Sequence, residues 1–156
     1  MRDVAIEHPA DVIAAQRAIR QEAIALGFTQ PACAELMIVA SELASNILKY
    51  AGRGCLRVEP IDDAERGLGL RLVAEDSGPH FKSFETALLD GYSDDGPVDL
   101  SALVARRGTA SGLGAVQRMT DALTWEPRRG GKAVIAVRYT SRPPNSTRFS
   151  NRYLGG

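Results

Sequence analysis

The sequence has few cysteines, no long apolar run and no excess of charge of either sign, which is typical of an ordinary globular protein. Its two cysteines, Cys33 and Cys55, show no CxxC or Cys/His spacing, so we expect neither a disulfide framework nor a zinc site. No run of about 18 apolar residues occurs, and the N-terminus has no signal-peptide pattern, which predicts a cytoplasmic protein. Nineteen basic and nineteen acidic residues balance, which gives no electrostatic case for binding nucleic acid or an anionic membrane.

The composition indicates one globular domain, since 44% of the 156 residues are hydrophobic and 24% are charged. A fold of this length buries roughly 68–70% of the surface of its unfolded chain, so it needs no metal or disulfide to hold it together. We therefore assign residues 1–140 to one domain. Residues 141–156 carry arginines and no acidic residue, and we expect them to form a flexible basic tail.

Apolar spacing predicts helices over 12–26, ending at Gly27, from Thr29 to about Gly52 or Gly54, and over 113–121. Alternating apolar residues predict strands over 4–6, 56–61, 68–74, 123–126 and 133–139, with short turns that favour antiparallel pairing. The fold class is α+β. We expect a two-layer sandwich of about three helices packed on one face of a mixed, mostly antiparallel sheet.

A polar stripe runs along the second predicted helix. At 100° per residue, Asn46 and Lys49 lie within about 40° of Glu42. The apolar residues Ala40, Leu43, Ala44, Ile47 and Ala51 fall on the opposite side. A stripe of this kind is usually a plain solvated face. It also places a carboxylate, an amide and an ammonium one turn apart, and these can serve as a base, a Mg²⁺ ligand and a phosphate contact.

Asp76 is a carboxylate at the end of an apolar strand. The period of two places it on the same, core-facing side as Leu68, Leu72 and Ala74. Burying it without a partner would be costly, so either the backbone amides of the following turn or a ligand must satisfy it. Gly78 lets another group approach the backbone closely. An Asx-type turn and a ligand site both remain open.

Small residues lead into the third predicted helix, from Gly108 to Val116. Backbone amides at a glycine-preceded helix N-terminus can bind an anion such as phosphate, although such a run can also be only a hinge. It matches neither the P-loop nor the dinucleotide fingerprint. The preceding segment, 91–110, contains at most a short helix around 100–105, and its length predicts a functional lid.

Taken in this order, the three places resemble the motifs of the GHKL ATPase superfamily, which includes histidine-kinase catalytic domains and anti-sigma-factor kinases. Residues 41–50, SELASNILKY, look like its N-box. Residues 75–79, EDSGP, look like its first glycine box, and residues 111–114, SGLG, like its second. The resemblance covers about residues 1–140 and is greatest to RsbT-like switch serine kinases of bacterial stress signalling.

The resemblance implies a Bergerat-type ATP site. Asp76 would then receive the adenine amino group while Gly78 gives the base room, and Asn46 would hold Mg²⁺. Glu42 would be the general base. The phosphates would meet Lys49 and the second glycine box with its approach, namely Gly108, Thr109, Ser111, Gly112, Leu113 and Gly114.

Two features depart from the family pattern. His80 follows Pro79 where the first box usually continues with a second glycine. The segment between Ser93 and Gly108 is longer than the lid of the similar kinases. Lid closure and partner choice are therefore the features that transfer least from the family.

The preferred function is an ATP-dependent protein serine/threonine kinase. The resemblance implies a STAS-domain antagonist as its substrate, with a phosphatase or a sigma factor as a further partner. The alternative is a nucleotide-gated binding module without kinase activity. A two-component histidine kinase fits poorly, because the only histidines are His8, beside Pro9, and His80. A ligand-free structural domain would leave Asp76 and the glycine-rich helix entry unexplained.

Overall fold

The computed structural model describes residues 1–89, 92–93, 96–97 and 112–142. In chain order, the elements are β1 (Arg2–Ile6), α1 (Ala10–Leu26), α2 (Gln30–Tyr50), β2 (Gly54–Asp63), β3 (Gly67–Asp76), α3 (Phe84–Ala87), β4 (Tyr92–Ser93), β5 (Gly96–Pro97), α5 (Leu113–Arg118), β6 (Ala122–Arg128) and β7 (Gly131–Tyr139).

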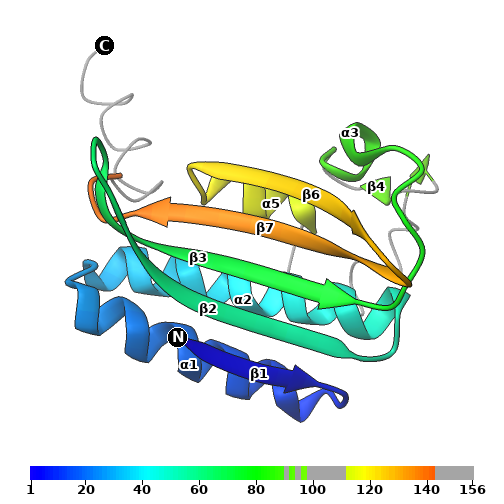
Figure 1. Cartoon of the computed structure of the whole chain (residues 1–156), viewed down its shortest axis with the longest axis horizontal. Coiled ribbons are helices and arrows are strands. Elements are labelled where there is room, and N and C mark those ends of the chain that lie inside the picture. The colour runs from blue at the N-terminus through cyan, green and yellow to red at the C-terminus, as the bar shows by residue number, and fades with distance from the viewer. Residues whose placement is uncertain (90–91, 94–95, 98–111, 143–156) are drawn as a thin grey trace.

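Five strands form one sheet in the order β1-β2-β3-β7-β6, and every pairing in it is antiparallel. The helices α1, α2 and α5 lie on one face of this sheet (Figure 1). The predicted α+β two-layer fold is confirmed. Strands β4 and β5 form a separate two-stranded ribbon inside the segment predicted to be a lid.

The ends of the two long helices follow from their capping residues. Gly27 ends α1 at a φ of 87°, and Thr29 caps α2 by accepting a hydrogen bond from the Ala32 amide at 3.3 Å. Pro31 stands in the first turn of α2, where its missing N–H costs nothing. Both predicted helices are therefore present, and their junction is set by three consecutive residues, 27–29.

The core lies between the sheet and α2. Leu36, Leu43 and Ile47 of α2 meet Leu56 and Leu72 of the sheet, and all five are at most 1% exposed. By length and composition alone α2 could cross a membrane. It is the central helix of this layer and half of its apolar window is buried in the fold, which explains its apolar character.

Two predicted details are wrong, and one short element was not predicted. Leu68 is 43% exposed, because it lies at the hairpin end of β3 beyond the cover of the helices. The third predicted helix ends at Arg118 rather than Asp121, because the Asp121 amide already bonds the carbonyl of Val137 at 2.8 Å. The four-residue α3, capped by Ser83, was not predicted because it is too short to show a period.

The chain after β7 begins with an anchored residue. Arg142 donates hydrogen bonds to the carbonyl oxygen of Thr120 and, at 2.6 Å, to that of Arg118, the last residue of α5. The tail prediction for 141–156 otherwise concerns residues 143–156, which lie outside the described residues. So do the helix predicted at 100–105 and most of the predicted lid.

Candidate functional site

The polar groups predicted on α2 lie along the C-terminal half of that helix. Asn46 is half-buried, and Lys49 is exposed with its Nζ 4.9 Å from the centroid of the Tyr50 ring. Residues three and four apart on a helix lie on the same side. The spacing therefore places the side chains of Glu42, Asn46 and Lys49 in one row toward the helix end.

Glu42 departs from the prediction of a solvated stripe, since it is only 4% exposed. Helix α2 contacts the sheet on one side and also packs against α1 and α5. A residue that points away from the sheet is therefore not necessarily in water. Glu42 is therefore a shielded carboxylate one turn before the half-buried amide of Asn46.

Asp76 ends β3 on the face covered by the helices, and its side chain is 5% exposed. Its Oδ1 accepts hydrogen bonds from the Gly78 amide at 2.8 Å and from Lys132 Nζ at 3.0 Å. The first of these is the turn expected from the sequence. Across the described residues, Oδ2 has no hydrogen-bond partner. The carboxylate is thus held through one oxygen and presents the other as an acceptor.

Glycines allow the backbone to close tightly around Asp76. A Cβ on Gly78 would lie 3.1 Å from the carbonyl oxygen of Tyr50, which ends α2. A Cβ on Gly131 would lie 1.9 Å from the carbonyl oxygen of Asp76, and one on Gly54 would meet β3 at 2.2 Å. The predicted close approach at Gly78 is therefore real, and the group that approaches is the C-terminal end of α2.

Lys132 is the site residue that sequence reasoning missed. It is directly opposite Asp76 in the β3–β7 register, and its side chain is 6% exposed. Its Nζ also lies 5.4 Å from the centroid of the Phe81 ring. A weak signal was available, because Lys132 comes directly before the predicted strand 133–139 and continues the alternation of the buried residues Val134 and Ala136, although the prediction started one residue too late to include it.

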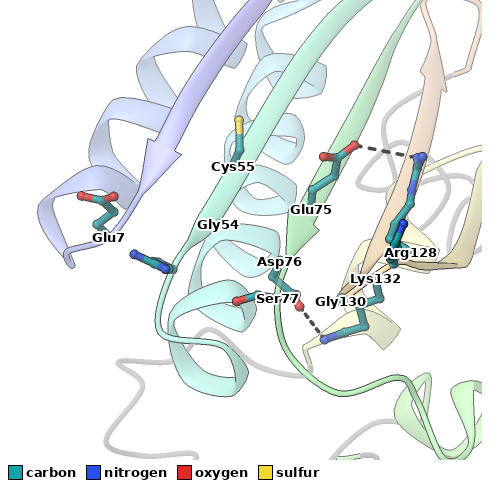
Figure 2. A pocket seen from close by; sticks show the side chains of 12 residues that line it. Glu7, Gly54, Cys55, Glu75, Asp76, Ser77, Arg128, Gly130 and Lys132 are labelled. Carbon is teal, nitrogen blue, oxygen red and sulfur yellow. Dashed lines mark hydrogen bonds and ion pairs between the residues drawn. The ribbon is translucent and has the colours of Figure 1, made fainter.

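A cavity of about 470 Å³ opens at this end of the sheet, and Figure 2 shows the Lys132–Asp76 and Arg128–Glu75 pairs within it. Its walls carry four cationic and three acidic residues. The lining residues are Glu7, Arg53, Gly54, Cys55, Glu75, Asp76, Ser77, Arg128, Arg129, Gly130, Gly131 and Lys132. Charged side chains of both signs therefore surround the buried Lys132–Asp76 pair.

The predicted second glycine box begins α5. Gly112 has φ 57° and ψ −129°, a backbone conformation that strongly favours glycine. Leu113 and Gly114 are buried, and α5 packs against α2. The structure thus brings this box to the helix that carries Asn46. Gly108, Thr109 and Ser111 lie outside the described residues, so their predicted phosphate contacts stay predictions.

His80, which follows the predicted first glycine box, reaches toward β6. Its Nε2 lies 3.4 Å from the carbonyl oxygen of Arg128, and its ring centroid is 6.0 Å from that of Trp125. Phe81 and Phe84 also contact Trp125, with centroid distances of 5.2 and 6.4 Å. The segment after the first box is therefore packed onto the sheet edge by aromatic side chains.

The described ranges contain no group of three or more His, Cys, Asp or Glu side chains that could hold a metal ion. A cation here would depend on an amide oxygen and on oxygens of its ligand. That is the usual mode of Mg²⁺ bound with phosphates, which keeps several waters and takes few protein ligands.

Comparison with known proteins decides the family. The chain is 33% identical over 131 residues to the serine/threonine-protein kinase RsbT of Bacillus subtilis (strain 168). The aligned region covers 83% of this chain and 89% of that protein. The chain belongs to the RsbT family of serine/threonine-protein kinases. This confirms the enzyme class that the three motifs predicted. No protein-family model matches the chain.

A solved structure supports the fold of this RsbT-family kinase. A chain of the SiaB–SiaC complex from Pseudomonas aeruginosa superimposes with a TM-score of 0.52, covering 88% of this chain and 89% of that one at 13% identity. At that identity the likeness concerns the fold alone. The α+β architecture of the RsbT-family kinase therefore recurs in a distant sequence.

Proposed function

We propose that this RsbT-family kinase transfers the γ-phosphoryl group of Mg-ATP to a serine or threonine of a small cytoplasmic partner, a STAS-domain antagonist. The transfer would switch which protein that partner binds in bacterial stress or sigma-factor signalling, where a phosphatase or sigma factor is the further partner. The observation that carries the ATP site is Asp76, a buried carboxylate with one free acceptor oxygen at the junction of α2 and β3.

Base recognition would use that free oxygen. A buried carboxylate that accepts a hydrogen bond from the adenine amino group forms a charge-assisted bond, which is stronger than a neutral one. Gly78 holds the turn against the end of α2, so Asp76 is positioned before ligand binds. Preorganisation of this kind removes part of the cost of binding.

The phosphates and the metal would lie along α2 toward α5. Asn46 offers an amide oxygen for Mg²⁺, and Lys49 a mobile ammonium for the phosphates. Backbone amides of Gly112, Leu113 and Gly114 would add to these, together with Gly108, Thr109 and Ser111. In such a site catalysis rests on positioning and on electrostatic stabilisation of the charge on the transferred group.

Glu42 would act as the general base that accepts the proton of the incoming hydroxyl. Its 4% exposure supports this role, because little bulk water reaches the carboxylate to compete with it as the acceptor of that proton. Asn46, one turn further along α2, would place the metal and the γ-phosphoryl group beside it. The two residues then have separable roles, one in chemistry and one in binding.

Phosphorylation of STAS-domain proteins, followed by mass spectrometry of serine and threonine sites, tests this function. Glu42→Gln should bind Mg-ATP nearly as well as the parent protein and lose phosphoryl transfer by roughly 10²–10⁴-fold, the usual contribution of a general base. Asn46→Ala should lose Mg-dependent ATP binding. Glu65→Gln, in the exposed β2–β3 turn, is the matched control and should change neither.

Full transfer by Glu42→Gln would remove Glu42 as the base. ATP binding without any transfer to a STAS-domain protein would instead favour the nucleotide-gated binding module. Failure of the parent protein to bind ATP would overturn the site itself. The three results are distinguishable because binding and transfer are measured separately.

A further inference from the structure

Lys132 is a buried cation that the roles proposed above leave unused. Its side chain is 6% exposed and its partner Asp76 is 5% exposed, with 3.0 Å between Nζ and Oδ1. Burying an ion pair costs about as much in desolvation as the pair returns, and apolar residues of similar volume often stabilise a fold equally well. Stability alone therefore does not explain a lysine at this position.

The ammonium has donor capacity beyond this ion pair. A lysine carries three N–H donors and no acceptor. One donor is used by Asp76, and the Phe81 ring, 5.4 Å from Nζ, attracts the same charge. Figure 2 shows the side chain of Lys132 extending from β7 toward the carboxylate at the cavity. Asp76 and Lys132 thus present an acceptor and a donor side by side.

The edge of adenine has the complementary pattern. Its amino group is a donor, and a ring nitrogen acceptor flanks that group on each side. When a carboxylate accepts from the amino group, one of these nitrogens faces the neighbouring protein group. An ammonium at hydrogen-bonding distance from the carboxylate lies at the right spacing to meet it.

We propose that Lys132 is a further base-contact residue, whose ammonium donates a hydrogen bond to a ring nitrogen beside the amino group held by Asp76. The proposal rests on the proposed ATP site. Under this proposal, two residues contact the base, Asp76 as the acceptor and Lys132 as the donor. They are already hydrogen-bonded to each other before the nucleotide binds. Lys132 would then help to set which base is accepted as well as how tightly.

Deaza nucleotides test this contact in the full chain. Affinities for ATP, 1-deaza-ATP and 7-deaza-ATP, which each replace one flanking nitrogen by C–H, are measured by calorimetry for the parent protein and for Lys132→Met. The parent should lose roughly 10- to 100-fold for one of the two analogues, the worth of a charge-assisted hydrogen bond. Lys132→Met should bind ATP and that analogue within about twofold of each other.

The ratio of the affinities for ATP and for the analogue, taken within one variant, does not depend on how much of that variant is folded. Lys132→Gln, which keeps a neutral donor, should show an intermediate ratio. Lys49→Met is the matched control, because it should weaken all nucleotides alike. 3-deaza-ATP changes a nitrogen that is not beside the amino group and should show no dependence on Lys132.

An equal analogue penalty in the parent and in Lys132→Met, or no penalty for either analogue in the parent, would overturn the contact while leaving the ATP site intact. Absence of ATP binding to the parent would overturn the proposed function instead.

Discussion

Strand β7 carries a buried cation at each end of its helix-facing side, and the two are built differently. Lys132 contacts one carboxylate oxygen, that of Asp76, at the end of the sheet where α2 terminates. Arg138 is fully buried at the other end and donates to Glu35 at 2.6 Å and to the carbonyl oxygen of Met119 at 2.7 Å. The arginine thus ties α2 and the end of α5 to the sheet.

The difference shows how one strand serves two purposes. Arg138 uses Nη1 for both of its hydrogen bonds, while its buried Nε and Nη2 have no hydrogen-bond partner in the described part of the chain. Lysine is a point charge on a flexible stem that can change its partner. The Arg138 end is further closed by Asp121, which pairs with Arg66 at 2.7 Å and accepts from the Tyr139 amide at 2.8 Å. The Lys132 end instead has glycines, a cavity and the Oδ2 of Asp76, which accepts no hydrogen bond from the residues that the structure describes.

The largest effect should come from Arg138→Met, which removes the buried cation that donates to Glu35 and to the carbonyl oxygen of Met119. We expect the free energy of unfolding to fall by about 3–5 kcal/mol, the usual cost of removing one partner of a buried pair. Urea unfolding followed by circular dichroism measures it. Lys132→Met, the matched change at the other end, should cost less, because Asp76 keeps the hydrogen bond from the Gly78 amide and lines a cavity that water can enter. Equal losses would mean that the two ends do not differ as described.

Asp76→Asn should lower ATP affinity by roughly 10- to 100-fold, because a charge-assisted acceptor becomes a neutral one. The ion pair with Lys132 changes the expectation for stability, since the variant leaves a buried ammonium without its counter-charge. The double variant Asp76→Asn with Lys132→Met should therefore recover stability and not affinity. Recovery of both would mean that Asp76 only pairs Lys132.

Two truncations sharpen the description of the Arg138 end. Removing residues 143–156 should leave stability and ATP affinity unchanged, because Arg142 still bonds the carbonyls at the end of α5. Removing 141–156 should cost about 1.5 kcal/mol of unfolding free energy, near the value of one hydrogen bond to a charged group. Differential scanning calorimetry of the two truncated proteins measures the difference. Identical melting curves would show that the hydrogen bonds of Arg142 do not stabilise the fold.

The smallest effect concerns the two thiols. Cys55 lines the cavity at the Lys132 end, whereas Cys33 is buried on α2 near the opposite end. Burial raises the pKa of the Cys55 thiol, and the nearby Asp3 carboxylate raises it further. Iodoacetamide should therefore modify Cys55 more slowly than a free thiol at pH 8, and the rate should keep increasing at pH values where a free thiol has already reached its maximum rate. Cys33 should remain unmodified. Preferential labelling of Cys33 would reverse the assignment of open and closed ends.

The sequence predicted the elements well because their signals are local. Gly27 and Thr29 mark a helix end and a helix start through their own backbone and side-chain preferences, and Asp76 followed from the alternation of β3. The candidate site was predicted in pieces, each from its own motif and the family resemblance. What holds those pieces together is tertiary and could not be read in the same way.

Glu42 and Lys132 show where local reasoning ends. The helical wheel placed Glu42 on a polar stripe, but its burial depends on packing by elements that are distant in the sequence. The pairing of Lys132 with Asp76 depends on the register of β7 against β3, across 56 residues of chain. The one available sign was a lysine directly before the predicted strand 133–139, in phase with the inward residues of that strand.

The glycines around Asp76 have a consequence for how this enzyme can diverge. Because a Cβ at Gly131 would lie 1.9 Å from the backbone of Asp76, and one at Gly54 2.2 Å from that of Glu75, substitutions that reshape this part of the main chain are closed to it. Variation in what this end of the sheet contacts is then left to the side chains that surround the glycines. Lys132, beside Gly131 and paired with Asp76, is one of these.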